Sequence, residues 1–215
     1  MGTIKQGILG GFSGKVGTVV GASWKGISYM RGQAQHVKNP RTAAQIYNRA
    51  ALQLITDTLR PIIPTLRLTF AKSAGKMSEF NKAVQINYKE AIVNQDGTPV
   101  VDYSKLVLSK GSIKPFDQLI INDMSQNGNY YMYPKNNDNS SVRYQGLIYF
   151  IYDVENKSWY TKIYEYSFRT GSMLDSYGIV LHANQSYLGF ACAYDPSTGQ
   201  VSNPVTEVQV YGGYH

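Results

Sequence analysis

The sequence predicts an α+β protein: an N-terminal glycine-rich β-ribbon with two or three helices, then a C-terminal antiparallel β-sandwich. Two uneven distributions indicate this division. Nine of the 20 glycines lie in the first 32 residues, whereas 15 of the 18 tyrosines follow residue 100. Residues 1–90 hold 13 lysines and arginines against three acids, and residues 91–215 hold 8 against 11. A turn-forming cluster at 94–97 lies between the halves, so we expect a basic region at 1–95 and a tyrosine-rich sandwich at 96–215.

Glycine-punctuated strands are predicted in the first 38 residues. From Lys15 to Met30, β-branched and aromatic residues alternate with small ones. A ribbon with this much glycine is marginal by itself. We therefore expect it to be completed by other parts of the chain or by a neighbouring subunit, through unpaired strand edges and apolar burial. The candidate subunit-interface residues are Phe12, Val16, Gly17, Val19, Val20 and Trp24.

The same region has no acidic residue before Asp57. Its basic residues can form a solvated face, or a surface that docks on nucleic acid or on an acidic partner, and both alternatives stay open. The candidate contacts to a polyanion or acidic partner are Lys5, Lys15, Lys25, Arg31, Lys38, Arg41 and Arg49.

Helices are predicted after Asn39-Pro40. Thr42 and Gln45 form a capping box, and apolar residues then recur at three- and four-residue spacing as far as Leu59. Pro61 and Pro64 are expected to end this helix, with a short helix possible over 64–70. A further amphipathic helix is predicted to start at Ser78 and to reach Ile92.

Short strands follow from residue 98. In the run from Gly146 to Asp153, apolar side chains fall on both faces, so this strand is expected at the centre of its sheet. Seven or eight strands over about 115 residues are typical of a sandwich. The other predicted strands are 102–109, 118–122, 130–133, 159–168, 178–181, 187–194 and 205–211.

No residue set indicates a reaction. The run from Gly10 to Val16 is not a phosphate-binding loop, because Leu9 stands where that loop needs glycine and Val16 where it needs serine or threonine. The three histidines are far apart in the sequence, and Cys192 lies in an apolar strand where a buried, inert thiol is expected. We therefore expect a non-enzymatic protein with no cofactor, no metal site and no small-molecule substrate.

Two resemblances add to these expectations. The segment from Gly178 to Tyr194, with Gly199 and Pro204 before the last strand, resembles strands E, F and G of a fibronectin type III domain. The resemblance implies an adhesive or spacing module, with Tyr187 at the place of the corner tyrosine. The usual tryptophan of the early strands is missing, because Trp159 comes later.

The opening QGILGGFSGKVGTVVG, with Trp24-Lys25-Gly26 and the later RTAAQ segment, resembles a domain-of-unknown-function family of Bacteroides-type bacteria and their phages. The combination of a basic glycine-rich ribbon, an Arg-Thr-x-x-Gln helix and a fibronectin-like module also looks like small phage virion proteins. This likeness implies a structural assembly protein, such as a neck, tail or capsid-associated subunit of a tailed phage virion. Its expected partners are itself and other structural proteins.

The alternative is a nucleic-acid-binding protein that uses the basic half. Single-strand binders interleave stacking aromatics with their cations, and most aromatics of the basic half are explained by strand or helix packing, which favours assembly. No membrane-spanning or targeting segment is apparent, so we expect a virion location if the gene is viral, with assembly in the host cytoplasm, and a cytoplasmic location otherwise.

Overall fold

The computed structural model describes residues 3–4, 11–24, 26–36, 39–123, 129–136, 143–165, 168–169, 179–182 and 186–209. The chain divides into two compact units, Met1–Thr42 and Ala43–His215. The predicted boundary near residue 95 falls at the tip of a hairpin inside the second of these units. Each unit is described by itself.

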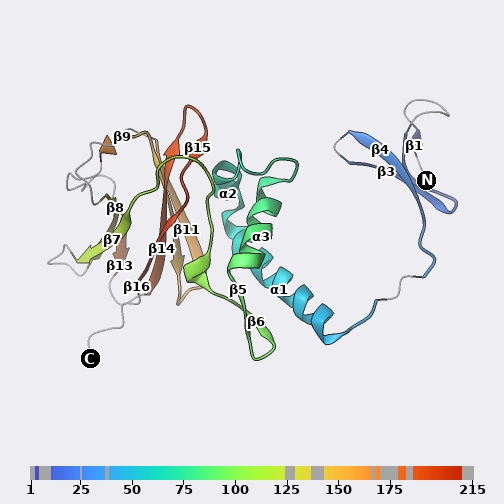
Figure 1. Ribbon diagram of the computed structural model, residues 1–215, viewed down its shortest axis with the longest axis horizontal. Coiled ribbons are helices and arrows are strands. Elements are labelled where there is room, and N and C mark those ends of the chain that lie inside the picture. Colours follow the sequence, from blue (N-terminus) through green and yellow to red (C-terminus); the bar gives the residue numbers. More distant parts are fainter. Residues whose placement is uncertain are drawn as a thin grey trace. The chain divides into compact units, whose positions relative to one another are not determined.

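The first unit is a four-stranded antiparallel sheet, labelled in part in Figure 1. Its strands are β1 (Thr3–Ile4), β2 (Phe12–Val16), β3 (Val19–Trp24) and β4 (Ile27–Gly32), in that spatial order. Two-residue turns join β2 to β3 and β3 to β4. Gly17 in the first turn has a φ of 56°, a left-handed conformation that glycine adopts without strain. The glycine punctuation therefore predicted these hairpins correctly.

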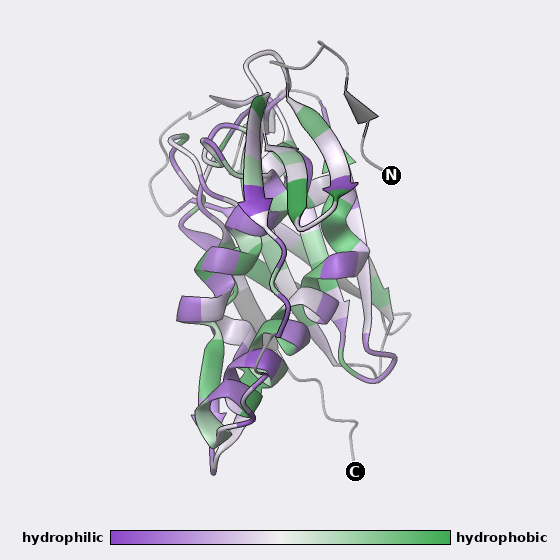
Figure 2. Ribbon diagram, turned by 90° about the vertical axis from the view of Figure 1, so that its right-hand side faces the viewer, coloured by the Kyte–Doolittle hydropathy of each residue, from purple (hydrophilic) through white to green (hydrophobic). Residues whose placement is uncertain are grey.

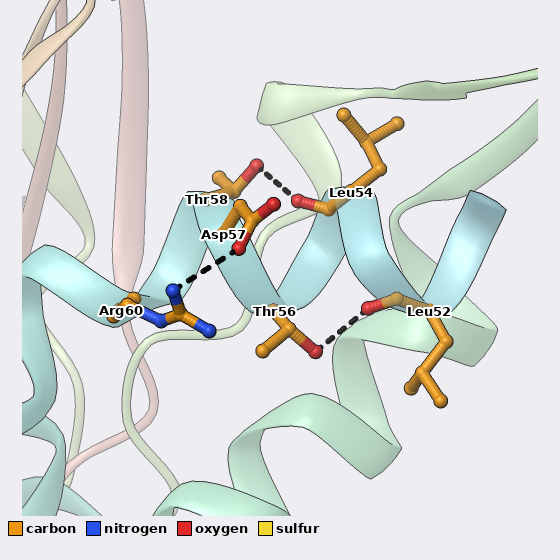
Figure 3. Close-up of polar contacts among 6 residues, drawn as sticks. All are labelled: Leu52, Leu54, Thr56, Asp57, Thr58 and Arg60. Atoms are coloured by element: carbon orange, nitrogen blue, oxygen red, sulfur yellow. Dashed lines mark hydrogen bonds and ion pairs between the residues drawn. The ribbon is translucent and has the colours of Figure 1, made fainter. Parts of the chain in front are cut away.

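The second unit begins with the predicted long helix, α1 (Ala43–Leu59). Its buried residues, Ala51, Ile55 and Leu59, recur every four residues along one side of the helix. In its last turns the hydroxyl groups of Thr56 and Thr58 donate to the carbonyls four residues earlier, at 2.7 and 2.8 Å (Figure 3). Arg60 and Asp57 form an exposed ion pair at 3.6 Å in the same view, which contributes little stability.

The prediction that the long helix ends at the prolines is confirmed, because α1 ends at Leu59, two residues before Pro61. The chain continues through a 3₁₀ turn, η1 (Arg60–Ile62), into α2 (Ile63–Thr69). Each proline stands in the first turn of its element, where no backbone N–H donor is needed. The helix over 64–70 is therefore present, and it continues the helical stretch without a break.

The helix predicted at Ser78 is α3 (Glu79–Glu90). The Ser78 hydroxyl caps it by accepting from the backbone N–H of Asn81 at 3.2 Å. Figure 2 shows that hydrophobic and hydrophilic residues are interspersed along the helices, as expected of amphipathic helices. A hairpin of β5 (Ile92–Gln95) and β6 (Thr98–Val101) comes next, and its turn is formed by the Asp96-Gly97 pair.

The remaining strands form three further sheets. The largest has the order β11-β10-β14-β15, with β16 also paired to β14; the others are β13-β8-β7 and β12-β9. Their bounds are β7 (Gln118–Asp123), β8 (Asn129–Lys135), β9 (Arg143–Tyr144), β10 (Leu147–Asp153), β11 (Ser158–Tyr164), β12 (Phe168–Arg169), β13 (Ile179–His182), β14 (Tyr187–Asp195), β15 (Gln200–Val201) and β16 (Val205–Gln209).

The five-stranded sheet is covered on both faces. Ile148 and Phe150 of β10 share a hydrophobic core with Ile55, Leu59 and other residues of the helices. The alternate residues of β10 belong to a second core, formed with residues of β7, β8 and β13. Figure 1 shows the same order of layers: helices, then the five-stranded sheet, then β7, β8 and β13. The predicted central position of β10 is confirmed by its pairing with β11 on one side and β14 on the other.

The two sheets approach closely at Gly189. A Cβ atom at this position would overlap the sulfur of Met132 and lie 3.3 Å from Leu119. Met132 and Leu119 belong to the three-stranded sheet and are buried. Glycine at 189 therefore lets one sheet pack closely on the other, and a side chain there would have to displace the Met132 side chain.

The strand predicted at 102–109 was wrong. Asp102 instead caps a 3₁₀ turn, η2 (Tyr103–Lys105), by accepting from the backbone N–H of Ser104 at 3.1 Å. The segment after η2 is extended, but side chains take several of its backbone hydrogen bonds in place of a neighbouring strand. Asn87 bonds both polar groups of Val107, and the Thr69 hydroxyl donates to the Leu108 carbonyl at 2.7 Å.

The predicted fold class is confirmed in its mixed composition. The described chain combines one long helix, two shorter ones and antiparallel strands in several small sheets. Helices and strands belong to one hydrophobic core in the second unit, so helical and β segments of this unit stabilise each other.

Candidate assembly surface on the N-terminal sheet

The strand register of the first unit sorts its side chains onto two faces. Residues directly opposite each other on paired strands lie on the same face. We call one side the tryptophan face, because Trp24 pairs with Ile27 there, and Ala22 with Tyr29. By the same register, the tryptophan face consists of Lys15, Val20, Ala22, Trp24, Ile27, Tyr29 and Arg31.

We call the opposite side the methionine face. It consists of Gly14, Val16, Val19, Gly21, Ser23, Ser28, Met30 and Gly32. A Cβ atom on Gly21 would overlap the carbonyl oxygen and ring of Phe12, so glycine is required there for the strands to approach. Among the described residues of this unit, only Gly21 is buried.

Large apolar side chains are exposed on both faces. The exposed fractions are 64% for Trp24 and 71% for Ile27 on the tryptophan face, and 68% for Met30 on the methionine face. Soluble chains rarely expose apolar groups in clusters unless the surface binds something. Full burial of such a side chain contributes about 1.5–3 kcal/mol, and this contribution is unused within the first unit.

The structure divides the predicted interface residues between these surfaces. Val16 and Val19 lie on the methionine face, and Val20 and Trp24 on the tryptophan face. Gly17 lies in the turn between β2 and β3, so it shapes the hairpin and does not belong to either face.

Sequence reasoning missed three exposed residues of β4: Ile27 and Met30, which are more exposed than any predicted interface residue, and Tyr29. β4 carries three large apolar residues between two glycines and no acid, but this composition also fits a strand with one buried face, so it did not indicate their exposure. The predicted interface residues came from the glycine-rich opening segment and therefore lie only in β2, in β3 and in the turn between them.

Of the seven predicted basic contacts, the structure brings two together. Lys15 and Arg31 both lie opposite Val20, on neighbouring strands of the tryptophan face. Arg41 is exposed in the segment after the sheet, and Arg49 is exposed on α1 in the second unit. Lys5, Lys25 and Lys38 lie outside the described residues.

A groove of about 460 Å³ lies in the second unit between α3, the segment after η2 and the start of β16. Its charged lining residues are Glu90, Lys105 and Lys110, and Lys105 is paired with Asp102 at 2.9 Å. Its only hydroxyl-bearing side chains are Ser104 and Thr206, and the Ser104 hydroxyl donates to the Asp102 carboxylate. We see no nucleophile with an adjacent base in this lining.

Metal-binding clusters and membrane-spanning helices are both absent from the described part of the chain. No group of three or more histidine, cysteine, aspartate or glutamate side chains lies together there in a metal-binding arrangement. None of the described helices has the length and apolar character needed to cross a bilayer. Cys192 is a free thiol in the core, and burial raises its pKa to about 12.

Comparisons with known proteins place this geometry in a family context. Residues 11–142 match the profile of DUF6266, described as a family of unknown function. The matched range contains β2, β3 and β4, all the helices and the strands as far as β8. A search of curated proteins found no significant match.

Proposed function

We propose that this chain, which belongs to the DUF6266 family of unknown function, is a non-enzymatic structural protein that self-associates through its N-terminal sheet. One observation carries the proposal. A sheet of four short strands exposes large apolar side chains on both faces and, among its described residues, buries only one glycine. A sheet needs a packed apolar face to be stable, so a second surface must cover this one.

The second unit supports the spacing role in this proposal. The proposed sandwich is supported by its strand orders, β7-β8-β13 and β11-β10-β14-β16, which resemble the A-B-E and C′-C-F-G orders of fibronectin type III and immunoglobulin-like sandwiches. Tyr187 is buried at the start of β14, where such domains place their corner tyrosine. A rigid module of this kind can hold neighbouring subunits apart in an assembly.

The likeness of the combined ribbon, helix and fibronectin-like module to small phage virion proteins adds a finer proposal. The assembly would be the virion of a tailed phage, with this chain in its neck, tail or capsid-associated part. Neighbouring genes for portal, tail or capsid proteins would support this setting, and a neighbourhood of metabolic genes would argue against it.

Trp24→Ala tests the proposed surface. Removing this side chain is expected to weaken self-association by about 2 kcal/mol or more, which is roughly a 30-fold rise in the dissociation constant. Size-exclusion chromatography with light scattering, over a range of concentrations, measures the change. Tyr160→Ala is the matched control, because Tyr160 is 55% exposed on β11 of the second unit. If both variants self-associate with the same dissociation constant as the native chain, the proposal is contradicted.

A second candidate, single-stranded nucleic acid binding, is favoured by a specific observation. The tryptophan face combines exposed Trp24 and Tyr29 with the cations Lys15 and Arg31. Exposed aromatics beside cations are the arrangement with which single-strand binders stack bases and contact phosphates.

Binding of a labelled oligonucleotide, titrated with salt, tests this candidate. If the face binds nucleic acid, affinity falls steeply as salt is added. Lys15→Gln with Arg31→Gln is then expected to reduce both the affinity and the salt slope, whereas Lys76→Gln in the second unit leaves them unchanged. No measurable binding at low salt would remove this candidate.

A further inference from the structure

Strand β4 is an unprotected edge of the N-terminal sheet. It pairs with β3 on one side and has no strand on the other among the described residues. All six of its residues are exposed. At the opposite edge, β1 has two residues. Short strands, lysines, prolines and bulges usually protect an edge, and the β4 sequence ISYMRG has a single charge, Arg31.

We propose that β4 pairs antiparallel with β4 of a second copy of this chain, across a two-fold axis at Tyr29. The pairing joins two four-stranded sheets into one continuous sheet. This inference rests on the proposed self-association and adds an edge contact, with its partner and register, to the contacts that cover the two faces of the sheet.

The register follows from symmetry. A two-fold axis that relates two antiparallel strands of one sheet is perpendicular to the sheet, so it leaves each side chain on its own face. Directly opposite residues share a face, and consecutive residues of a strand do not. The axis must therefore pass through a residue and not between two residues. An axis at Tyr29 places Tyr29 opposite Tyr29, Ile27 opposite Arg31 and Ser28 opposite Met30. An axis at Met30 would instead place Ser28 opposite Gly32, which has no side chain. It would also leave the 71% exposed Ile27 with no β4 residue opposite it.

Charge favours the same arrangement. The first 42 residues carry six lysines and arginines and no acid, so a second copy must keep its cations apart. With the axis at Tyr29, the two Arg31 side chains point away from each other along the strands. Each lies beside Ile27 of the second copy and within reach of Trp24 on the next strand, where a guanidinium group can stack on the indole ring.

Cysteine cross-linking tests this pairing in the full-length chain. Directly opposite residues in an antiparallel sheet have Cα atoms about 4.5–5.5 Å apart, within the range that a disulfide bridges. Tyr29→Cys is therefore expected to form a covalent dimer on mild oxidation. The control is Ser23→Cys, which is exposed on β3 and would lie three strand spacings, about 14 Å, from its counterpart. The native thiol, Cys192, is fully buried and does not compete.

A second pair of variants keeps the test decisive if loss of the tyrosine weakens pairing. Ile27→Cys and Arg31→Cys chains are expected to cross-link to each other when mixed, and neither to itself. If light scattering shows association but neither set cross-links above the Ser23→Cys control, this pairing is wrong and the proposed self-association stands. If the native chain stays monomeric at every concentration, both proposals are wrong.

Discussion

Replacing Asn87 by alanine is expected to lower the free energy of unfolding of the second unit by about 3 kcal/mol. Asn87 is completely buried on α3. Its side-chain amide donates to the carbonyls of Ala83 and Val107 at 2.9 and 2.8 Å, and its carbonyl oxygen accepts from the N–H of Val107 at 2.7 Å. The alanine variant leaves both polar groups of Val107 without these bonds in a partly buried site, which costs about 1–3 kcal/mol for each group.

Urea unfolding measures this loss, with Asn81→Ala as the control. Asn81 lies on the same helix, but its side chain is exposed. The control is expected to change stability by about 0.5 kcal/mol or less. Equal stability of the two variants would show that Asn87 does not hold the extended segment against the helix.

Alkaline pH is expected to destabilise the second unit above about pH 9. Burial raises the pKa of the Cys192 thiol from 9.0 to about 12, with the nearby Ser109 acting in the opposite direction. Burial also raises the pKa of Tyr149 well above its usual value of 10.0. For Tyr103, burial and then the hydrogen bond with Tyr152 raise the pKa. In each case the folded chain keeps a proton that the unfolded chain loses.

The pH range of this destabilisation is set by the pKa of the Cys192 thiol in the unfolded and folded chain. The stability contributed by the protonated thiol is fully present below pH 9, the ordinary value of its pKa, and is lost progressively as the pH rises toward 12. One pKa unit corresponds to about 1.4 kcal/mol, so at pH 11 the thiol alone removes about 3 kcal/mol. Urea unfolding of the native chain at several pH values measures the slope.

Cys192→Ala separates the thiol from the tyrosines. Between pH 9 and 12 the unfolding free energy of this variant is expected to fall less steeply than that of the native chain. The two slopes are expected to differ by about 1.4 kcal/mol per pH unit, because one titrating group is gone. A native chain and a variant with identical slopes would show that the thiol is not shielded from water in the folded state.

Much of the second unit could be predicted because its local patterns agree with its packing. β10 carries apolar residues on both faces, and the structure places one face against helices and the other against a second sheet. Ser78 precedes an amphipathic run and caps α3. Turn residues and alternating patterns likewise located β7, β8 and β14 to within a few residues.

Other features depend on contacts between distant residues. The segment after Asp102 has a strand-like sequence, but its backbone bonds to Asn87 and Thr69, which lie on helices earlier in the chain. Exposure of β4 could not be read from its pattern either, because the alternation of apolar residues also fits a strand with one buried face.

The central claim is that the N-terminal sheet is covered when copies of the chain associate. Fluorescence of Trp24 tests it most directly, because the chain has two tryptophans and the Trp159→Phe variant leaves Trp24 as the sole reporter. As protein concentration and the mass from light scattering rise together, emission is expected to shift to shorter wavelength and acrylamide quenching to fall. A rising mass with Trp24 as accessible to acrylamide as in the dilute chain would contradict the account.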